Sequence, residues 1–445
     1  MAGEWRETLL GEFAPFTYGK GLPEPKRDPL GDIPVFGSNG IVGYHSEALT
    51  SGPTVVIGRK GTVGAVHFSP KACWPIDTTF FVVDEDADIL RFKYYLLKAL
   101  ELEHMNADSA VPGLNRDAAH ALKVWVPPIA EQRAIAHILG ALDDKIELNR
   151  RMSQTLEAMA RALFKSWFVD FDPVRAKCRG DSCGRPVGQA QGPAPTDSGQ
   201  AQGPAPTDCG QAQGPAPTDW QWPQHILDLF PDRLVDSELG EIPEGWDVAT
   251  LADFALLNPE SWSKETRPEI IKYVDLSNTK WGRIETVTIH ARHDAPSRAQ
   301  RVLRPGDTIV GTVRPGNGSY TLVAEEGLTG STGFAVLRPR KADWVEFVYL
   351  AGTAASNIDT LANLADGAAY PAVRPEVVAS TPVVRPDDSV LGEFSKHAAP
   401  LLARMAQSDR ESRTLAALRD ALLPKLIRGE IRVKDAERFL QERGL

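Results

Sequence analysis

Two long stretches of the chain share one pattern of apolar and polar positions. In each, apolar residues recur at alternating steps of three and four, which is typical of a helix that buries one narrow stripe against a partner helix. The first stretch runs over residues 128–173. Pro128 and Glu131 suit its first turn, and Pro173 is expected to end it. The pattern therefore predicts a long amphipathic helix that needs a partner.

The second stretch, residues 387–445, supplies that partner and then a short tail. Its apolar positions follow those of the first stretch at a constant distance of 259 residues. Asn149 and Ser408 interrupt the two stripes at matching places, as a polar residue does when it fixes register at some cost in stability. We call the matched positions the seam: Leu142, Asn149, Leu156, Leu163, Leu401, Ser408, Leu415 and Leu422.

The two remaining large segments predict similar α+β domains. Residues 1–127 contain short β-type runs separated by glycine, with a helix expected at about 90–103. Residues 241–386 repeat this plan, since DTIVGTVRPGNG parallels VVIGRKGTVG and AAYPAVRPEV lies 259 residues after SAVPGLNRDA. The framework is duplicated and the loops differ, which is typical of two scaffolds that present different recognition surfaces.

A low-complexity segment, residues 174–240, separates the first helix from the second domain. It holds three copies of GQAQGPAPTD at a spacing of 11 residues. Each copy contains two prolines and two glycines, so the segment cannot be helical and is expected to be a flexible linker.

Composition limits the class of protein. The chain of 445 residues is 42% hydrophobic, with no apolar run of membrane length and no leader at Met1, so we expect a cytoplasmic protein. The four cysteines have neither disulfide nor zinc-ligand spacing. We expect no metal site and no catalytic residues, because no nucleophile, carboxylate pair or phosphate loop stands out. The net charge of −10 is unusual for a protein that binds DNA alone.

Several motifs resemble specificity subunits of type I restriction-modification systems. IAEQRAIAHILGALDDKIELNRR with ARALFKSWFVDFDPV resembles their central conserved region, and RDALLPKLIRGEI resembles the end of their distal region. GSNGIVGY, VVIGRKGTVGAV and PGDTIVGTVRP resemble the variable target-recognition domains between those regions. The resemblance implies an antiparallel coiled coil that holds two recognition domains in a pseudo-twofold internal repeat, each reading half of a split DNA target.

The resemblance also implies partners and cofactors. The chain would work with two modification (methyltransferase) subunits, and for restriction with two translocating endonuclease subunits. S-adenosylmethionine, and ATP with Mg²⁺, would bind those partners and not this chain. The chain itself would be a non-catalytic subunit of an adenine-N6 methyltransferase and type I endonuclease complex. Partners could then supply much of the phosphate neutralisation that this acidic chain lacks.

Two groups of residues are predicted to make these contacts. Loop residues expected to bind double-stranded DNA are Ser38, Asn39, Arg59, Lys60, Lys71, Arg298, Arg301, Arg314, Asn317 and Tyr320. Four aromatic residues, Phe164, Trp167, Phe168 and Phe171, are expected either to dock a partner subunit or to close the end of the coiled coil against the adjoining domain.

Two other functions remain open. Two β-rich modules on a coiled coil could bind protein or glycan instead of DNA. An intact but unused specificity cassette would have the same sequence as an active subunit.

Overall fold

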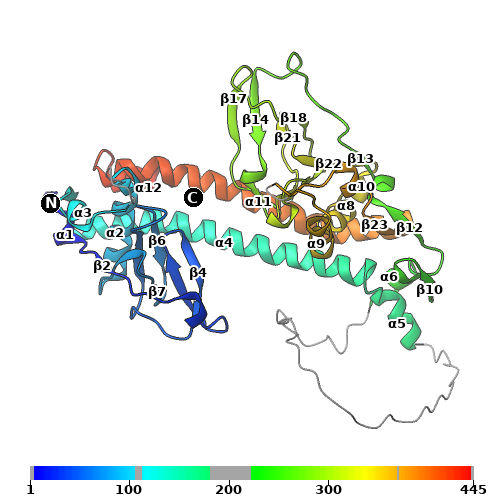
Figure 1. Ribbon diagram of the computed structural model, residues 1–445, viewed down its shortest axis with the longest axis horizontal. Helices are drawn as coiled ribbons and strands as arrows, with labels where there is room; N and C mark the ends of the chain where they lie inside the picture. The colour runs from blue at the N-terminus through cyan, green and yellow to red at the C-terminus, as the bar shows by residue number, and fades with distance from the viewer. Residues whose placement is uncertain (1–4, 106–112, 181–221, 368–369, 442–445) are drawn as a thin grey trace, which may run out of the picture. The chain divides into compact units, whose positions relative to one another are not determined.

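The computed structural model describes residues 5–105, 113–180, 222–367 and 370–441, without the side chains of 178–180 and 439–441. The three GQAQGPAPTD repeats lie outside these residues. The chain divides into two compact units, Met1–Arg151 with Ser408–Leu445 and Met152–Gln407. Each unit therefore contains one predicted α+β domain and parts of both long helices (Figure 1).

The first unit begins with a domain of short strands, which we call the first strand domain. Its elements are β1 (Arg6–Leu9), α1 (Leu10–Phe13), β2 (Thr17–Tyr18), η1 (Glu24–Lys26), β3 (Ile33–Gly37), β4 (Gly40–His45), β5 (Thr54–Gly58), β6 (Val66–Ser69), β7 (Trp74–Pro75), β8 (Thr79–Val82), α2 (Ala87–Ala99), η2 (Leu102–Met105), α3 (Arg116–His120) and β9 (Lys123–Val126). The predicted strand runs and the helix near residue 90 are confirmed. Asp86 caps α2 by accepting hydrogen bonds from the backbone N–H groups of Asp88 and Ile89.

The second unit contains an equivalent domain, the second strand domain. Its region begins after α5 (Asp172–Gly180) and α6 (Gln224–Leu227). The elements that follow are β10 (Leu234–Ser237), β11 (Gly240–Pro243), β12 (Asp247–Thr250), α7 (Leu251–Phe254), β13 (Ala255–Leu257), β14 (Ile270–Val274), η3 (Leu276–Asn278), β15 (Thr279–Lys280), β16 (Arg283–Ile284), β17 (Thr288–Ala291), β18 (Ala299–Val302), β19 (Thr308–Gly311), η4 (Pro315–Asn317), β20 (Tyr320–Leu322), β21 (Leu328–Ser331), β22 (Phe334–Pro339), η5 (Ala342–Trp344), α8 (Val345–Gly352), α9 (Ala355–Asn363), α10 (Pro375–Ala379) and β23 (Pro382–Arg385).

Sheet topology confirms that the two domains are copies. The sheet β2-β8-β5-β6 of the first corresponds to β13-β22-β19-β20 of the second, and β4-β3-β7 corresponds to β17-β14-β21. In both, the second sheet contains one parallel pair, β3 with β7 and β14 with β21. Fully buried strands β5 and β19 lie at the centre of each copy, because their Val and Ile side chains suit a strand covered on both faces.

Two helices of 40 residues, α4 (Ile129–Phe168) and α11 (Asp388–Ile427), are the predicted long helices. Each is about 60 Å long at about 1.5 Å per residue. They pack antiparallel within each unit. In the first unit, Asp143 binds Arg419 and Asn149 approaches Ser408; in the second, Phe164 and Phe168 of α4 pack on Phe394.

The seam is buried unevenly. Leu142, Asn149, Ser408, Leu415 and Leu422 are buried. The seam residues Leu156, Leu163 and Leu401 are half-buried instead. A straight helix drifts by about 20° per heptad relative to a 3.5-residue repeat, so the buried stripe moves off the predicted positions.

The predicted end of the first helix and the extent of the linker need correction. The helix α4 ends at Phe168, and Phe171 adopts a positive φ of 54°. Pro173 then lies in the first turn of α5 and not at a helix end, because proline fits a first turn, where its missing N–H has no partner to lose. Residues 172–180 and 222–243 carry regular elements, although the linker was predicted to include residues 174–240.

The α12 helix (Val433–Gln441) completes the first unit after α11. Among the described residues, no helix is long and apolar enough to cross a membrane.

Candidate nucleic-acid interface

In the first strand domain, the turn after β5 carries two of the predicted DNA-binding residues. The backbone N–H groups of Arg59 and Lys60 both donate to the carbonyl oxygen of Thr78, at 2.9 and 3.1 Å. On its other side the turn is held by Leu114, whose N–H donates to the Arg59 carbonyl at 2.9 Å, and by a bridge between Lys60 and Gly113. The turn is thus fixed by backbone hydrogen bonds, and its side chains can vary without changing its path.

The side chains on this turn differ in exposure. The half-buried Arg59 guanidinium lies 5.4 Å from the centre of the Tyr18 ring, and its Nη2 donates to the Asp77 carbonyl at 2.8 Å. Arg116 approaches the same Tyr18 ring at 5.1 Å. Lys60 is exposed. The result is a small basic group around an exposed tyrosine, and Arg116 and Tyr18 were not among the predicted residues.

The other three predicted residues of this domain lie on neighbouring turns. Asn39 is exposed in the β3–β4 turn, and Lys71 is exposed between β6 and β7. Ser38 is buried, and its hydroxyl donates to the Thr78 carbonyl at 2.7 Å. The Ser38 side chain therefore stabilises the turn that carries Arg59, and in this structure it is not presented for base contact.

The second strand domain has the same turn after β19. The N–H of Thr312 donates to the Gly333 carbonyl at 2.8 Å, and that of Val373 donates to the Thr312 carbonyl at 2.9 Å. A bridge joins Val313 to Ala372, as the bridge to Gly113 does in the first domain. These backbone contacts make the two turns equivalent.

Arg314 follows directly in the second turn. Its φ of 48° and ψ of 61° place it in the left-handed region, which costs a residue other than glycine about 1 kcal/mol or more. Its N–H donates to the Pro371 carbonyl at 2.7 Å, and its guanidinium lies 5.2 Å from the exposed ring of Tyr370. Strain of this kind is concentrated at functional sites.

Arg314 lines a pocket of about 540 Å³. The pocket brings together three of the predicted residues, Arg298, Arg314 and Asn317, and adds Lys280 and Tyr370. Asp275 is the acidic residue among its lining side chains, and both its carboxylate oxygens accept hydrogen bonds, from the Leu276 N–H and the Tyr273 hydroxyl. Lys280 was not among the predicted residues, although Gly282, two residues later, is a turn signal and has a φ of 81°.

Two predicted residues of the second domain do not line this pocket. Arg301 is half-buried in β18 and donates to the Ser261 hydroxyl at 3.2 Å, and burial lowers its pKa. Tyr320 is buried, and the Arg161 guanidinium of α4 lies 5.7 Å from its ring. The Tyr320 ring thus packs inside the unit against the long helix, and in this structure it is not presented for base contact.

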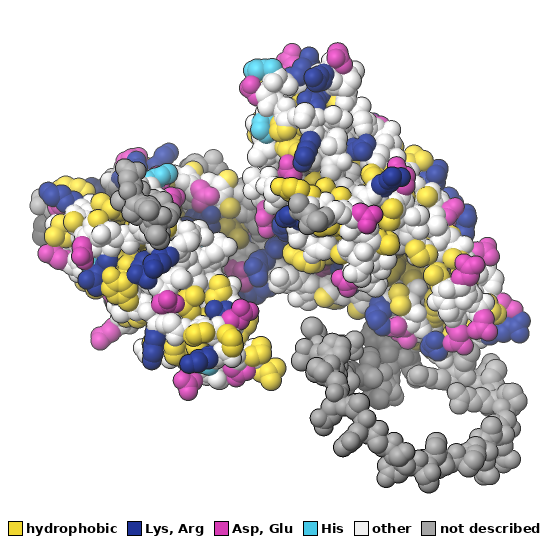
Figure 2. All heavy atoms as spheres, in the orientation of Figure 1, with side chains coloured by type: hydrophobic (Ala, Val, Ile, Leu, Met, Phe, Trp, Pro, Cys, Tyr) yellow, Lys and Arg dark blue, Asp and Glu magenta, His cyan; other side chains and the backbone are white. Residues whose placement is uncertain are grey.

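Basic side chains do not form one large patch on the face drawn in Figure 2. On the face in Figure 2, Lys and Arg side chains form small groups among Asp and Glu. Many are paired, such as Arg304 with Glu260 and Arg233 with Glu244. This pattern agrees with the net charge of −10.

The four aromatic residues near the end of α4 form part of the core of the second unit. Trp167 is fully buried, and Phe164, Phe168 and Phe171 are at most 9% exposed. They pack with aromatic residues from other elements of the unit: Phe230, Trp246, Phe347 and Phe394. Their burial favours the second alternative, closure of the helix end against the adjoining domain, over an exposed docking surface.

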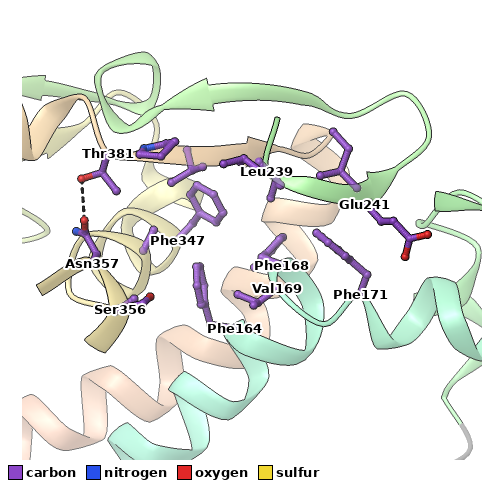
Figure 3. A pocket seen from close by; sticks show the side chains of 16 residues that line it. Phe164, Phe168, Val169, Phe171, Leu239, Glu241, Phe347, Ser356, Asn357 and Thr381 are labelled. Carbon is purple, nitrogen blue, oxygen red and sulfur yellow. Dashed lines mark hydrogen bonds between the residues drawn. The ribbon is translucent and has the colours of Figure 1, made fainter. Parts of the chain in front are cut away.

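A pocket of about 340 Å³ opens beside this cluster (Figure 3). Phe164, Phe168 and Phe347 line its apolar part, and at its other side the Thr381 hydroxyl donates to the Asn357 side-chain oxygen at 3.1 Å. Among the described residues, no group of three His, Cys, Asp or Glu side chains could hold a metal ion.

Comparisons with known proteins agree with this architecture. A family described as "Type I restriction modification DNA specificity domain" matches residues 2–158. The HindI specificity subunit of Haemophilus influenzae is 27% identical over 377 residues, which cover 80% of this chain and 81% of that protein. The MjaIX specificity subunit of Methanocaldococcus jannaschii is 20% identical, covering 86% of this chain and 78% of that protein.

A solved structure has the same fold. The crystal structure of the type I restriction-modification S subunit from M. genitalium matches with a TM-score of 0.54 at 16% identity, and covers 95% of this chain and 96% of that one. Motifs, duplicated topology and relatives agree: residues 2–158 match the type I restriction modification DNA specificity domain, and most of the chain is similar to specificity subunits of type I restriction-modification systems.

Proposed function

We propose that this chain reads a split DNA target, with one strand domain for each half-site, and that it catalyses no reaction itself. The observation that carries this proposal is the repeated turn after β5 and β19. Both turns are held by the same backbone bridges, to Gly113 and to Ala372, and they present different basic side chains. A fixed backbone with variable side chains is what two readers of different sequences require.

The residues on the turns suit base recognition. An arginine can donate two hydrogen bonds to guanine, and an asparagine can bind adenine in the same way. Arg314 and Asn317 line one pocket in the second domain, and Arg59, Lys60 and Asn39 lie on adjacent turns of the first. Cation–π contacts with Tyr370 and Tyr18 restrict the guanidinium groups of Arg314 and Arg59, so less side-chain entropy is lost on binding.

The partners complete the activity. The chain would assemble with two modification subunits, which bind S-adenosylmethionine and methylate adenine N6 after flipping the base from the duplex. Two restriction subunits using ATP and Mg²⁺ would join for cleavage. Because these partners contact phosphates, the chain needs only a few basic residues, in keeping with its acidic composition. Half-sites about one helical turn, roughly 34 Å, apart would suit such a two-domain reader.

The direct test is a map of N6-methyladenine in DNA from cells that carry the chain with its cognate modification subunit, compared with cells that lack only the chain. A split motif that disappears with the chain is the expected result. If the assembled complex leaves the map unchanged while the same modification subunit methylates DNA with another specificity subunit, the proposal fails. A silent cassette or a scaffold without DNA binding then remains.

A matched pair of variants tests the site. Arg314→Ala should relax the base preference at one position of one half-site, with a loss of discrimination of about 1–3 kcal/mol. Arg304→Ala, which removes an exposed arginine paired with Glu260 in the same domain, should leave the motif unchanged. Equal effects of both variants would argue against the pocket as the reading site.

A further inference from the structure

In the first unit, a tyrosine of the strand domain reaches an ion pair of the long helices. Tyr95 of α2 is 1% exposed, and its hydroxyl donates to Oδ2 of Asp143 on α4 at 2.6 Å. The other oxygen, Oδ1, accepts from Nη1 of Arg419 on α11 at 2.6 Å. One carboxylate thus joins the strand domain to both helices.

The second unit has a corresponding group built from different positions. Tyr349 of α8 is fully buried, and its hydroxyl donates to Oε1 of Glu157 on α4 at 3.4 Å. The same oxygen accepts from Nη2 of Arg161 at 2.7 Å, and Nη1 of Arg161 donates to the Thr353 carbonyl at 2.9 Å. Again a phenol, a carboxylate and a guanidinium connect the strand domain to the helix.

We propose that these two groups, Tyr95–Asp143–Arg419 and Tyr349–Glu157–Arg161, fix the angle at which each strand domain sits on the helices of its own unit, and thereby set the gap accepted between the half-sites. We call them the clamps. This inference rests on the proposed DNA-reading function. The clamp residues belong to α2, α4, α8 and α11 and not to the turns that carry Arg59 and Arg314, so they are positioning residues and not base readers.

Packing alone does not account for these groups. A phenylalanine ring would fill the space of either tyrosine ring and would need no hydrogen bond. The buried tyrosine hydroxyl, in contrast, needs a hydrogen-bond partner. Burial and the neighbouring carboxylate raise the pKa of Tyr95 and of Tyr349, so both hydroxyls remain donors at neutral pH. The arginine restricts the direction of each carboxylate, since charge-assisted hydrogen bonds are strong and directional.

Close-packed glycines adjoin both clamps. A Cβ on Gly282 would lie 2.9 Å from the Tyr349 hydroxyl and 3.1 Å from Oε1 of Glu157. In the first unit, a Cβ on Gly140 would lie 2.8 Å from Nε of Arg91, which binds Asp144 at 2.5 Å and so attaches α2 to α4 a second time. At both places the strand domain approaches the helix so closely that an added Cβ would require the neighbouring side chain, Arg91 or Tyr349, to shift.

The test uses the full chain with its modification subunit and DNA substrates that carry the two half-sites at the native gap or at a gap one base pair longer or shorter. We expect Tyr95→Phe and Tyr349→Phe each to lower the preference for the native gap about tenfold, the factor that corresponds to about 1.4 kcal/mol. Base preferences within both half-sites should stay unchanged. Tyr94→Phe, which removes the neighbouring phenol of α2, is the matched control and should keep the native gap preference.

The outcomes separate positioning from simple folding support. Two results would overturn the proposal. One is a loss of activity by the same factor on the substrates of every gap length, and the other is an unchanged gap preference in an assembled and active complex. Asp143→Asn, which keeps an acceptor for Tyr95 but weakens the pairing with Arg419, should give an intermediate relaxation. A graded series of this kind is not expected from a purely structural role.

A second measurement needs no DNA. Spin labels on unnatural amino acids at Ser51 and Ala141, both exposed in the first unit, report the distance between its strand domain and α4. Tyr95→Phe should broaden that distance distribution, and an unchanged distribution would refute the clamp even if the methylation map showed no split motif. If the chain directs no sequence-specific methylation but Tyr95→Phe broadens the distance distribution, the proposed function is refuted. The role of the clamp in holding the strand domain on the helix would then still stand.

Discussion

The buried asparagine on the seam offers the sharpest test of what holds the helix pair together. Asn149 is fully buried, and its Nδ2 donates to Oε2 of Glu411 at 3.1 Å and approaches the Ser408 carbonyl at 3.5 Å. Its Oδ1 is buried with no hydrogen-bond partner among the described residues. We expect Asn149→Leu to stabilise the first unit by about 1 to 2 kcal/mol.

That magnitude follows from three opposing terms. A hydrogen bond to a charged group is worth about 1.5–3 kcal/mol, but Glu411 is 32% exposed and keeps Lys145 at 3.5 Å, so the loss lies at the low end. Removing the unsatisfied Oδ1 recovers about 1–3 kcal/mol. Burying a leucine side chain adds about 1.5–3 kcal/mol, less the strain of fitting its branched end. The two gains outweigh the loss.

The assay is native-state hydrogen exchange of the parts of α4 and α11 in the first unit, because two units need not unfold together. Slower exchange around residues 142–151 and 408–422 is expected in Asn149→Leu. Asn149→Ala, which loses the same hydrogen bonds but leaves a cavity, should exchange faster than the wild type. Faster exchange in Asn149→Leu would refute the reasoning, since it would mean that the amide stabilises the pair more than an apolar side chain does.

Three further predictions concern burial, charge and space. Leu415→Ala should lower the free energy of unfolding of its unit by about 2–5 kcal/mol in urea titrations, and Leu156→Ala by clearly less, because Leu415 is 1% exposed and Leu156 is half-buried. Burial raises the pKa of Glu346, so its ionised carboxylate opposes folding as pH rises through that pKa. Glu346→Gln should therefore raise the thermal unfolding temperature at pH 7, and this increase should disappear below about pH 4. Gly318→Ala should lower the stability of the second unit by about 1–3 kcal/mol in the same titrations, because its φ is +68° and a Cβ would lie 2.5 Å from the Trp281 ring.

Local patterns predicted most of the elements. The 3.6-residue and 2-residue periods are properties of neighbouring residues, so the two long helices and the strand runs around β3, β5 and β8 were found from the sequence. The constant spacing of 259 residues also fits two helices that start at Ile129 and Asp388 and end at Phe168 and Ile427. The position of Pro173 does not follow from the sequence, because proline is tolerated both beyond a helix end and in a first turn.

Exposure of individual side chains could not be predicted in the same way. Tyr320 looked like a loop residue, but its burial depends on Arg161, which lies 159 residues earlier in the chain. The four aromatic residues near the end of α4 are buried by Phe347 and Phe394, and the sequence around residue 168 does not indicate those partners. Lys280 joins the pocket of Arg314 only through the fold of the sheet. Long-range contacts decide these cases, and a single sequence does not display them.

The duplicated turns explain how such a chain can change its recognition surface without losing its fold. In each strand domain, backbone atoms make the bonds that hold the turn, from Thr78 and Leu114 in the first and from Gly333 and Val373 in the second. Because these bonds use backbone atoms, replacing Arg59 by another residue removes its contact with the Tyr18 ring and its hydrogen bond to the Asp77 carbonyl but leaves the backbone bonds of the turn. The clamps lie on other elements, α2 and α8, and contact the long helices instead. Under the two proposals, readout and placement depend on separate sets of residues, the turns on one side and the clamps on the other.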